Sequence, residues 1–118
     1  MNYKIIEKMD KKYIKINQVI NTEEDVLEII GICISNNTKL VILKEDAISD
    51  EFINLKSGLA GIALQKFINY HIKASTIINK DKIEGRFKEL VYELNKSNNF
   101  KVFDNIIDAE NWILNIKQ

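Results

Sequence analysis

The sequence predicts one α/β domain over residues 1–118, with elements in the order β-β-α-β-α-β-α-β-α. Three patterns predict this class: two short N-terminal segments with alternating polar and apolar residues, later segments with helical spacing, and a regular alternation of the two types. Strands joined by helices pair in parallel through right-handed crossovers. We therefore expect a mostly parallel sheet in which only the N-terminal hairpin is antiparallel.

The first half of the chain supplies the hairpin, one helix and the central strand. Residues 3–8 and 12–16 alternate polar and apolar side chains on either side of a polar break, which indicates a hairpin. Thr22 and the acids after it indicate the start of a helix, because Thr22 can cap the helix and the acids complement its positive end. That helix runs to about residue 35. The apolar run at 40–43 is typical of a strand covered on both faces.

The second half predicts three more helices and two more strands. A helix spans about 57–70, a strand 71–78, a helix about 81–96, a strand 100–103, and a last helix starts near 105. Asp81 and Glu84 have capping-box spacing at the start of the third helix. The last helix carries an apolar side of Ile106, Ile107, Ala109, Trp112, Ile113 and Ile116. Lysines at 4, 8, 73 and 101 share one face of the strands, so we expect helices mainly on the other face.

Composition disfavours several classes of function, although it leaves a local basic patch possible. Seventeen basic and seventeen acidic side chains give no net charge, which disfavours a nucleic-acid binder. There is no apolar run long enough for a membrane span or a signal peptide, so we expect a cytoplasmic protein. The single cysteine, Cys33, falls on the apolar side of the first helix and is expected to be an inert core thiol.

One segment, residues 54–64, carries a functional signal because it lies between the central strand and the next helix. Ser57 is a suitable N-cap whose hydroxyl can accept from residue 59 or 60, and Gly58 and Gly61 keep the first turn free of bulk. Leu59 and Ile62 are expected to point away from an inward stripe of Ala60, Ala63, Leu64, Phe67 and Ile68. An apolar helix start of this kind is expected either to be buried or to face a partner.

The sequence Ser-Gly-Leu at the start of this helix resembles the D-S-x-G-L element of STAS domains, the SpoIIAA-like fold of bacterial anti-sigma-factor antagonists. A closer resemblance, over about residues 20–116, is to a family of small bacterial proteins known as a domain of unknown function; it rests on LKSGLAG, LQKFINY, GRFKE and FKVFDNIIDAENWIL. In the antagonists the serine before the glycine is phosphorylated by a partner kinase, which binds the unmodified form through this helix start. The resemblance places that serine at Ser57, whereas Leu55 stands where the antagonists have Asp.

These observations leave three hypotheses open. The first is a non-enzymatic, STAS-like interaction module that binds a protein partner and is switched by phosphorylation of Ser57. The second is a small-molecule binder or minor enzyme at the same edge of the sheet, using Lys56, Gln65, Asn69 and Arg86. The third is a homodimer that buries Leu59 and Ile62 against a second copy. The candidate binding residues are Lys56, Ser57, Gly58, Leu59, Gly61, Ile62, Gln65, Asn69 and Arg86.

Other polar residues give weaker signals, and we assign no catalytic residue, cofactor or metal. Acids at 45, 46, 50 and 51 could hold Mg²⁺ but are more typical of a solvated loop. His71 has no partner at a catalytic spacing, so we expect a strand-end histidine that is hydrogen-bonded in place. Arg86 could clamp an anion, although a surface ion pair is the commoner role.

Overall fold

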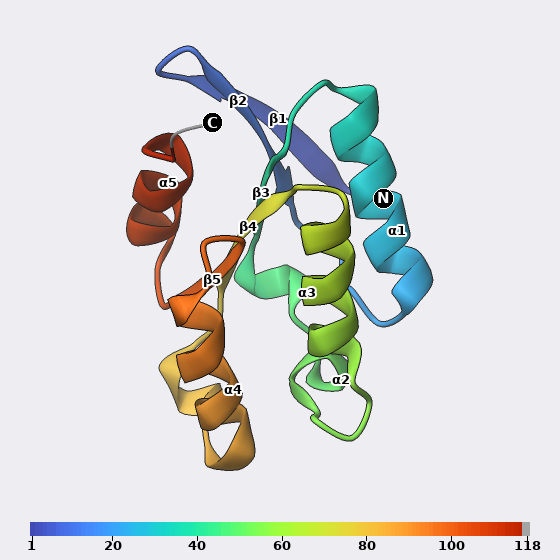
Figure 1. Cartoon of the computed structure of the whole chain (residues 1–118), viewed down its shortest axis with the longest axis vertical. Helices are drawn as coiled ribbons and strands as arrows, with labels where there is room; N and C mark the ends of the chain where they lie inside the picture. Colours follow the sequence, from blue (N-terminus) through green and yellow to red (C-terminus); the bar gives the residue numbers. More distant parts are fainter. Residues whose placement is uncertain (117–118) are drawn as a thin grey trace.

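The computed structural model describes residues 1–116 and shows a five-stranded sheet with helices on both faces (Figure 1). The strands are β1 (Tyr3–Lys8), β2 (Lys11–Ile16), β3 (Leu40–Leu43), β4 (Lys73–Ile77) and β5 (Phe100–Phe103). They lie side by side in chain order, and only β1 and β2 are antiparallel. The α/β class, the parallel sheet and the antiparallel hairpin are therefore confirmed.

Five α-helices connect or follow these strands: α1 (Glu23–Ser35), α2 (Asp50–Ile53), α3 (Leu59–Asn69), α4 (Gly85–Lys96) and α5 (Ile106–Leu114). The predicted cap of α1 is confirmed, since Thr22 Oγ1 accepts from the Asp25 amide at 3.2 Å and the Asp25 carboxylate accepts from the Thr22 amide at 3.1 Å. Two short 3₁₀ turns, Glu45–Ala47 and Lys80–Lys82, follow β3 and β4. No helix within residues 1–116 combines the length and apolarity needed to cross a membrane.

The two faces of the sheet carry cores of different size. Helices α1, α3 and α4 pack on one face and contribute to the larger core, whereas α5 packs alone on the other face (Figure 1). β3 is buried on both sides, with Val41 and Leu43 in the larger core and Leu40 and Ile42 in the smaller one. The smaller core consists of Tyr13, Leu40, Ile42, Ile77, Ala109, Ile113 and Leu114. With Phe52 of α2, four helices thus contribute to the core on one face and one helix to the core on the other.

Two details of the predicted helices are wrong. Asp81 and Glu84 do not form a capping box, because the Asn79 side chain accepts from the Asp81 amide at 2.9 Å and holds residues 80–82 in a separate 3₁₀ turn. The helix α4 starts only after Glu84, which makes no side-chain cap. In α5, Ile107 is 69% exposed, because Ala109 and Ile113 turn toward the sheet and Ile107 lies on the opposite side of the helix.

Candidate functional site

The turn before α3 is held by the hydroxyl of Ser57. Ser57 Oγ accepts from the Leu59 amide at 3.2 Å, as the sequence predicted, and donates toward two carbonyl oxygens, of Glu51 at 2.7 Å and Asn54 at 2.8 Å. Gly58 then enters the helix with φ of +69°, a left-handed conformation that favours glycine. Ser57 is half-buried, so its hydroxyl links the end of α2 to the start of α3.

The predicted direction of Leu59 is wrong. Leu59 is only 4% exposed and belongs to the larger core with Ala63 and Phe67, which follow it at intervals of four residues. Ile62 is half-buried, whereas Ile68, which was expected to face inward, is 37% exposed. The helix is rotated about its axis relative to the predicted stripe. The apolar surface expected from Leu59 and Ile62 is therefore largely inside the protein.

A different set of residues forms the exposed side of α3. Gly61, Gln65 and Ile68 follow one another at helical spacing on the solvent side, and Leu55 and Lys56 are exposed in the preceding turn. We call these five residues the α3 surface. Leu55 and Ile68 were missed as candidate site residues, because Leu55 is an isolated apolar residue in a polar turn and Ile68 was assigned to the inward stripe of the helix.

The remaining predicted site residues are partly brought together. Gln65 donates to Asn69 Oδ1 at 3.0 Å along the exposed side of α3, so these two side chains lie together. Arg86 is exposed on α4, a separate helix, and no ion pair among residues 1–116 includes it. Gly58 is exposed beside Ser57. The structure thus groups the α3 residues along one helix and leaves Arg86 on another.

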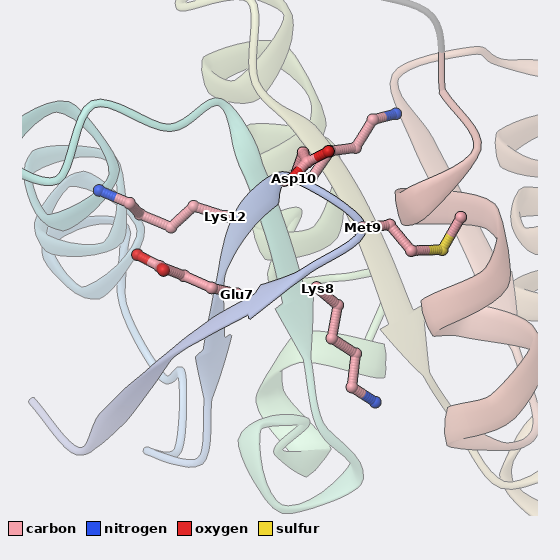
Figure 2. Close-up of a pocket in the computed structure, with 6 residues that line it drawn as sticks. Glu7, Lys8, Met9, Asp10 and Lys12 are labelled. Atoms are coloured by element: carbon pink, nitrogen blue, oxygen red, sulfur yellow. The ribbon is translucent and has the colours of Figure 1, made fainter.

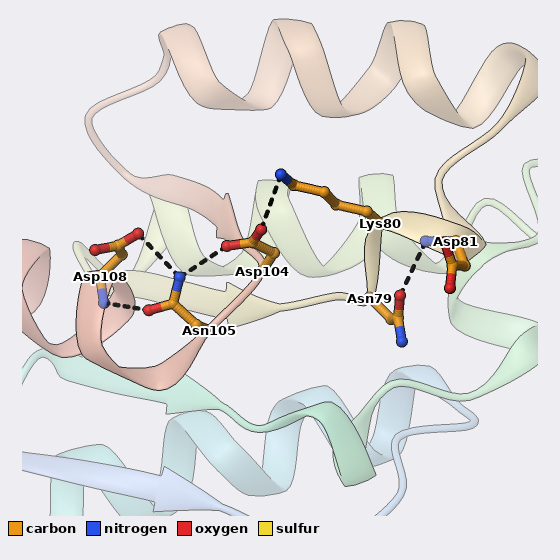
Figure 3. Close-up of polar contacts among 6 residues, drawn as sticks. All are labelled: Asn79, Lys80, Asp81, Asp104, Asn105 and Asp108. Atoms are coloured by element: carbon orange, nitrogen blue, oxygen red, sulfur yellow. Dashed lines mark hydrogen bonds and ion pairs between the residues drawn. The ribbon is translucent and has the colours of Figure 1, made fainter.

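Polar residues at the carboxyl ends of β4 and β5 are engaged with one another (Figure 3). Lys80 Nζ lies 3.1 Å from the carboxylate of Asp104, and Asn105 donates to Asp104 at 2.8 Å while it caps α5 through the Asp108 amide. The Asn105 hydrogen bond and the Lys80 ammonium lower the pKa of Asp104. Because all crossover helices lie on one face and the strands follow chain order, this end of the sheet has no reversal of strand order at which doubly wound folds bind ligands.

Five surface hollows on residues 1–116 lie away from the α3 surface. A hollow of about 480 Å³ surrounds the β1–β2 turn, lined by residues 7–12 (Figure 2). Another, of about 290 Å³, lies between α1 and the amino end of β4 and includes Ile34, Tyr70 and Ile72. Neither these two nor three further hollows includes any of residues 44–69. The α3 surface is thus not the wall of any of these hollows.

His71, Cys33 and the acidic residues after β3 occupy positions that test their predicted roles. The acids at 45, 46, 50 and 51 are exposed, and no three His, Cys, Asp or Glu side chains in residues 1–116 lie close enough together to hold a metal ion. His71 is exposed in a left-handed turn with φ of +59°, and its ring makes no hydrogen bond to residues 1–116, so the expected hydrogen-bonded histidine is wrong. Cys33 is buried as predicted, and burial raises its pKa to about 12.

A polar cluster that the sequence did not indicate lies under α5. The hydroxyl of the fully buried Tyr13 donates to Glu110 Oε2 at 2.5 Å, and Lys8 Nζ lies 3.0 Å from Glu110 Oε1. The Tyr13 hydrogen bond, followed by the Lys8 ammonium, lowers the pKa of Glu110 against the opposing effect of burial. Burial is the main cause that raises the pKa of Tyr13. This cluster fastens α5 to β1 and β2.

The fold and the exposed helix define a small α/β protein with a five-stranded mixed sheet and an accessible helical surface beside it. The chain belongs to the family described as a domain of unknown function (DUF4180), whose sequence profile matches residues 8–113. The expected resemblance to such a family is therefore confirmed, and the match begins earlier than residue 20. No curated protein and no solved structure matches the chain.

Proposed function

We propose that this protein is a STAS-like interaction module that binds a protein partner through the α3 surface. The observation that carries the proposal is the division of α3 into a buried side, with Leu59, Ala63 and Phe67, and an exposed side, with Gly61, Gln65 and Ile68. A small ligand needs a concave site that covers most of its surface. An exposed helix outside the hollows is better suited to a second protein.

Gly61 supports close approach by such a partner. A glycine in a helix interior destabilises the helix by roughly 0.5–1 kcal/mol relative to alanine. Gly61 has an ordinary helical φ, and a Cβ built there would meet nothing within 4 Å. The fold therefore does not require glycine at this position. A partner whose backbone or side chains pack against the helix gives a physical reason for its small size.

Phosphorylation of Ser57 supplies a switch in this proposal. A phosphate cannot donate to the carbonyl oxygens of Glu51 and Asn54, which now accept from the hydroxyl at 2.7 and 2.8 Å. The negative phosphate would face the negative ends of two carbonyl dipoles, so the turn between α2 and α3 has to rearrange. Because Leu55 and Lys56 lie in that turn, modification changes the α3 surface itself.

Site-specific photocrosslinking in the native host tests the docking surface. A photoreactive amino acid at Gln65 is compared with the same amino acid at Glu89, an exposed position on α4. We expect a protein adduct of defined mass from position 65 and none of that mass from position 89. Equal adducts from both positions, or none from position 65, would contradict the proposal.

The switch is tested separately once the partner is known. We expect Ser57→Asp to weaken partner binding, and Ser35→Asp, on an exposed serine of α1, to leave it unchanged. Mass spectrometry of protein from the native host then checks for phosphate on Ser57. Equal binding by the two variants would refute the switch and leave the docking surface standing.

A further inference from the structure

The two edge strands of the sheet, β1 and β5, differ in length and in how much of each strand is exposed to solvent. β5 is four residues long, and Phe100 and Val102 are buried. β1 is six residues long, and all its residues except Ile6 are exposed, including Tyr3 at 37% and Ile5 at 47%. A long exposed edge strand is a template for pairing with another strand unless charges or bulges prevent it. β1 is therefore the edge to consider.

The hydrogen bonds within the hairpin identify the backbone groups of β1 that face outward. The Asn17 amide donates to the Asn2 carbonyl at 3.1 Å, in the same register that places Tyr3 opposite Ile16. Hydrogen-bonded and non-hydrogen-bonded pairs alternate along an antiparallel ladder. Even-numbered residues of β1 therefore bond to β2, and the amides and carbonyls of Tyr3, Ile5 and Glu7 point away from it.

We propose that β1 pairs with β1 of a second copy in antiparallel fashion, about a two-fold axis at Ile5, so that the sheet continues through both subunits. In this register Ile5 faces Ile5, Tyr3 faces Glu7 and Lys4 faces Ile6, and the outward groups at 3, 5 and 7 are all used. Shifting the axis to residue 4 or 6 places Lys4 opposite Lys4 or Lys8. Like charges directly opposite each other are destabilising, so the charges of β1 disfavour both of these registers relative to the Ile5 register.

The side chains of β1 favour the same arrangement. Tyr3 and Ile5 face Ile16 and Ile14 across the hairpin, and those two isoleucines belong to the larger core. Pairing two copies covers the exposed Ile5 side chains with each other and extends that core across the axis. The β1–β1 interface closes on itself, so it produces a dimer and not a filament. The β1–β1 interface uses no residue of the α3 surface, so failure of one proposal would not affect the other.

Engineered cysteines on β1 test the register. Opposite residues of a hydrogen-bonded pair have Cα atoms roughly 5.5 Å apart, inside the disulfide range of about 4.4–6.8 Å. We expect Ile5→Cys to form an intermolecular disulfide under mild oxidation, and Lys4→Cys not to do so, because its two copies are displaced along the strands. Native Cys33 is buried and does not compete.

Solution mass tests the dimer without a crosslink. We expect sedimentation equilibrium to give twice the 13.7 kDa chain mass at high concentration. Ile5→Lys places two charges at the axis and should give the single-chain mass, whereas Met9→Lys, at the exposed hairpin tip, should not. A monomer at every concentration, a larger assembly, or equal crosslinking by Ile5→Cys and Lys4→Cys would overturn the proposal.

Discussion

The helices α3 and α5 lie on opposite faces of the sheet and are held there in different ways. α3 contributes Leu59, Ala60, Ala63 and Phe67 to the larger core, and the polar side chains on its outer side bond only locally or to α1. α5 contributes fewer residues to a smaller core and is also held to the strands by hydrogen bonds and an ion pair. Ser75 donates to the Ala109 carbonyl at 3.1 Å, and Glu110 receives Tyr13 and Lys8.

The two helices therefore differ in whether their outer side chains are needed to hold the helix on the sheet. α3 is held by burial of one side, and its other side stays exposed, as the proposed docking surface requires. In α5, Glu110 is already committed to holding the helix in place. The proposed docking surface lies on α3, and we expect the acid sensitivity of the fold to depend on α5; variants of each helix test both expectations.

The largest effect is expected inside α3. Phe67 is fully buried and stacks with Phe100 at 6.1 Å between ring centroids. Phe67→Ala leaves a cavity, and we expect it to lower the free energy of unfolding by about 3–5 kcal/mol. Urea denaturation measures this. A loss under about 1 kcal/mol would mean that burial does not hold α3 as described.

The next effect is expected under α5 and depends on pH. Tyr13→Phe removes the hydrogen bond to the partly buried Glu110 carboxylate, and we expect a loss of about 1.5–3 kcal/mol at pH 7. The lowered pKa of Glu110 means that its contribution is present above its unfolded pKa and is lost as pH falls through its folded pKa.

The acid side of the stability curve distinguishes this hydrogen bond from lost packing. Between neutral pH and pH 3, the free energy of unfolding should fall less steeply for Tyr13→Phe than for the wild type. The reason is that the variant lacks the largest cause of the lowered Glu110 pKa. Ile113→Ala, in the same small core, serves as the control and should keep the wild-type slope. Equal slopes for wild type and Tyr13→Phe would place the acid sensitivity elsewhere.

A smaller effect is expected at the turn before α3. Ser57→Ala removes the hydroxyl that accepts from the Leu59 amide, and loss of such a cap costs about 1 kcal/mol. Thermal unfolding measures the difference. No change would mean that Ser57 does not hold the turn, and the switch proposed there would lose its structural basis.

The smallest effect is expected on the outer side of α3 and has the opposite sign. Gly61→Ala should raise stability by roughly 0.5–1 kcal/mol, because alanine favours the helix and the added methyl group meets open space. Gly58→Ala is the matched contrast and should destabilise the protein, since Gly58 has φ of +69°. If Gly61→Ala is destabilising, this side of α3 is not free in the subunit.

Local patterns predicted the elements well and their orientation less well. The run at 40–43 and the cap at Thr22 are short-range signals, and both are confirmed. The helix over 57–70 starts apolar nearly all round, so periodicity could not fix its rotation. Leu59 was therefore expected outside and is buried, and Ile68 was expected inside and is exposed. Tyr13 and Glu110 are 97 residues apart, and no local pattern indicates such a pair.

The most direct test of the account is the affinity of the crosslinked partner for Gly61→Arg, measured together with the free energy of unfolding. An arginine at position 61 has open space in the free subunit and projects from the α3 surface. We predict that partner binding is lost while stability remains near that of the wild type, and that Glu89→Arg on α4 keeps both. Undiminished partner binding by a folded Gly61→Arg variant would contradict the assignment of α3 as the docking surface.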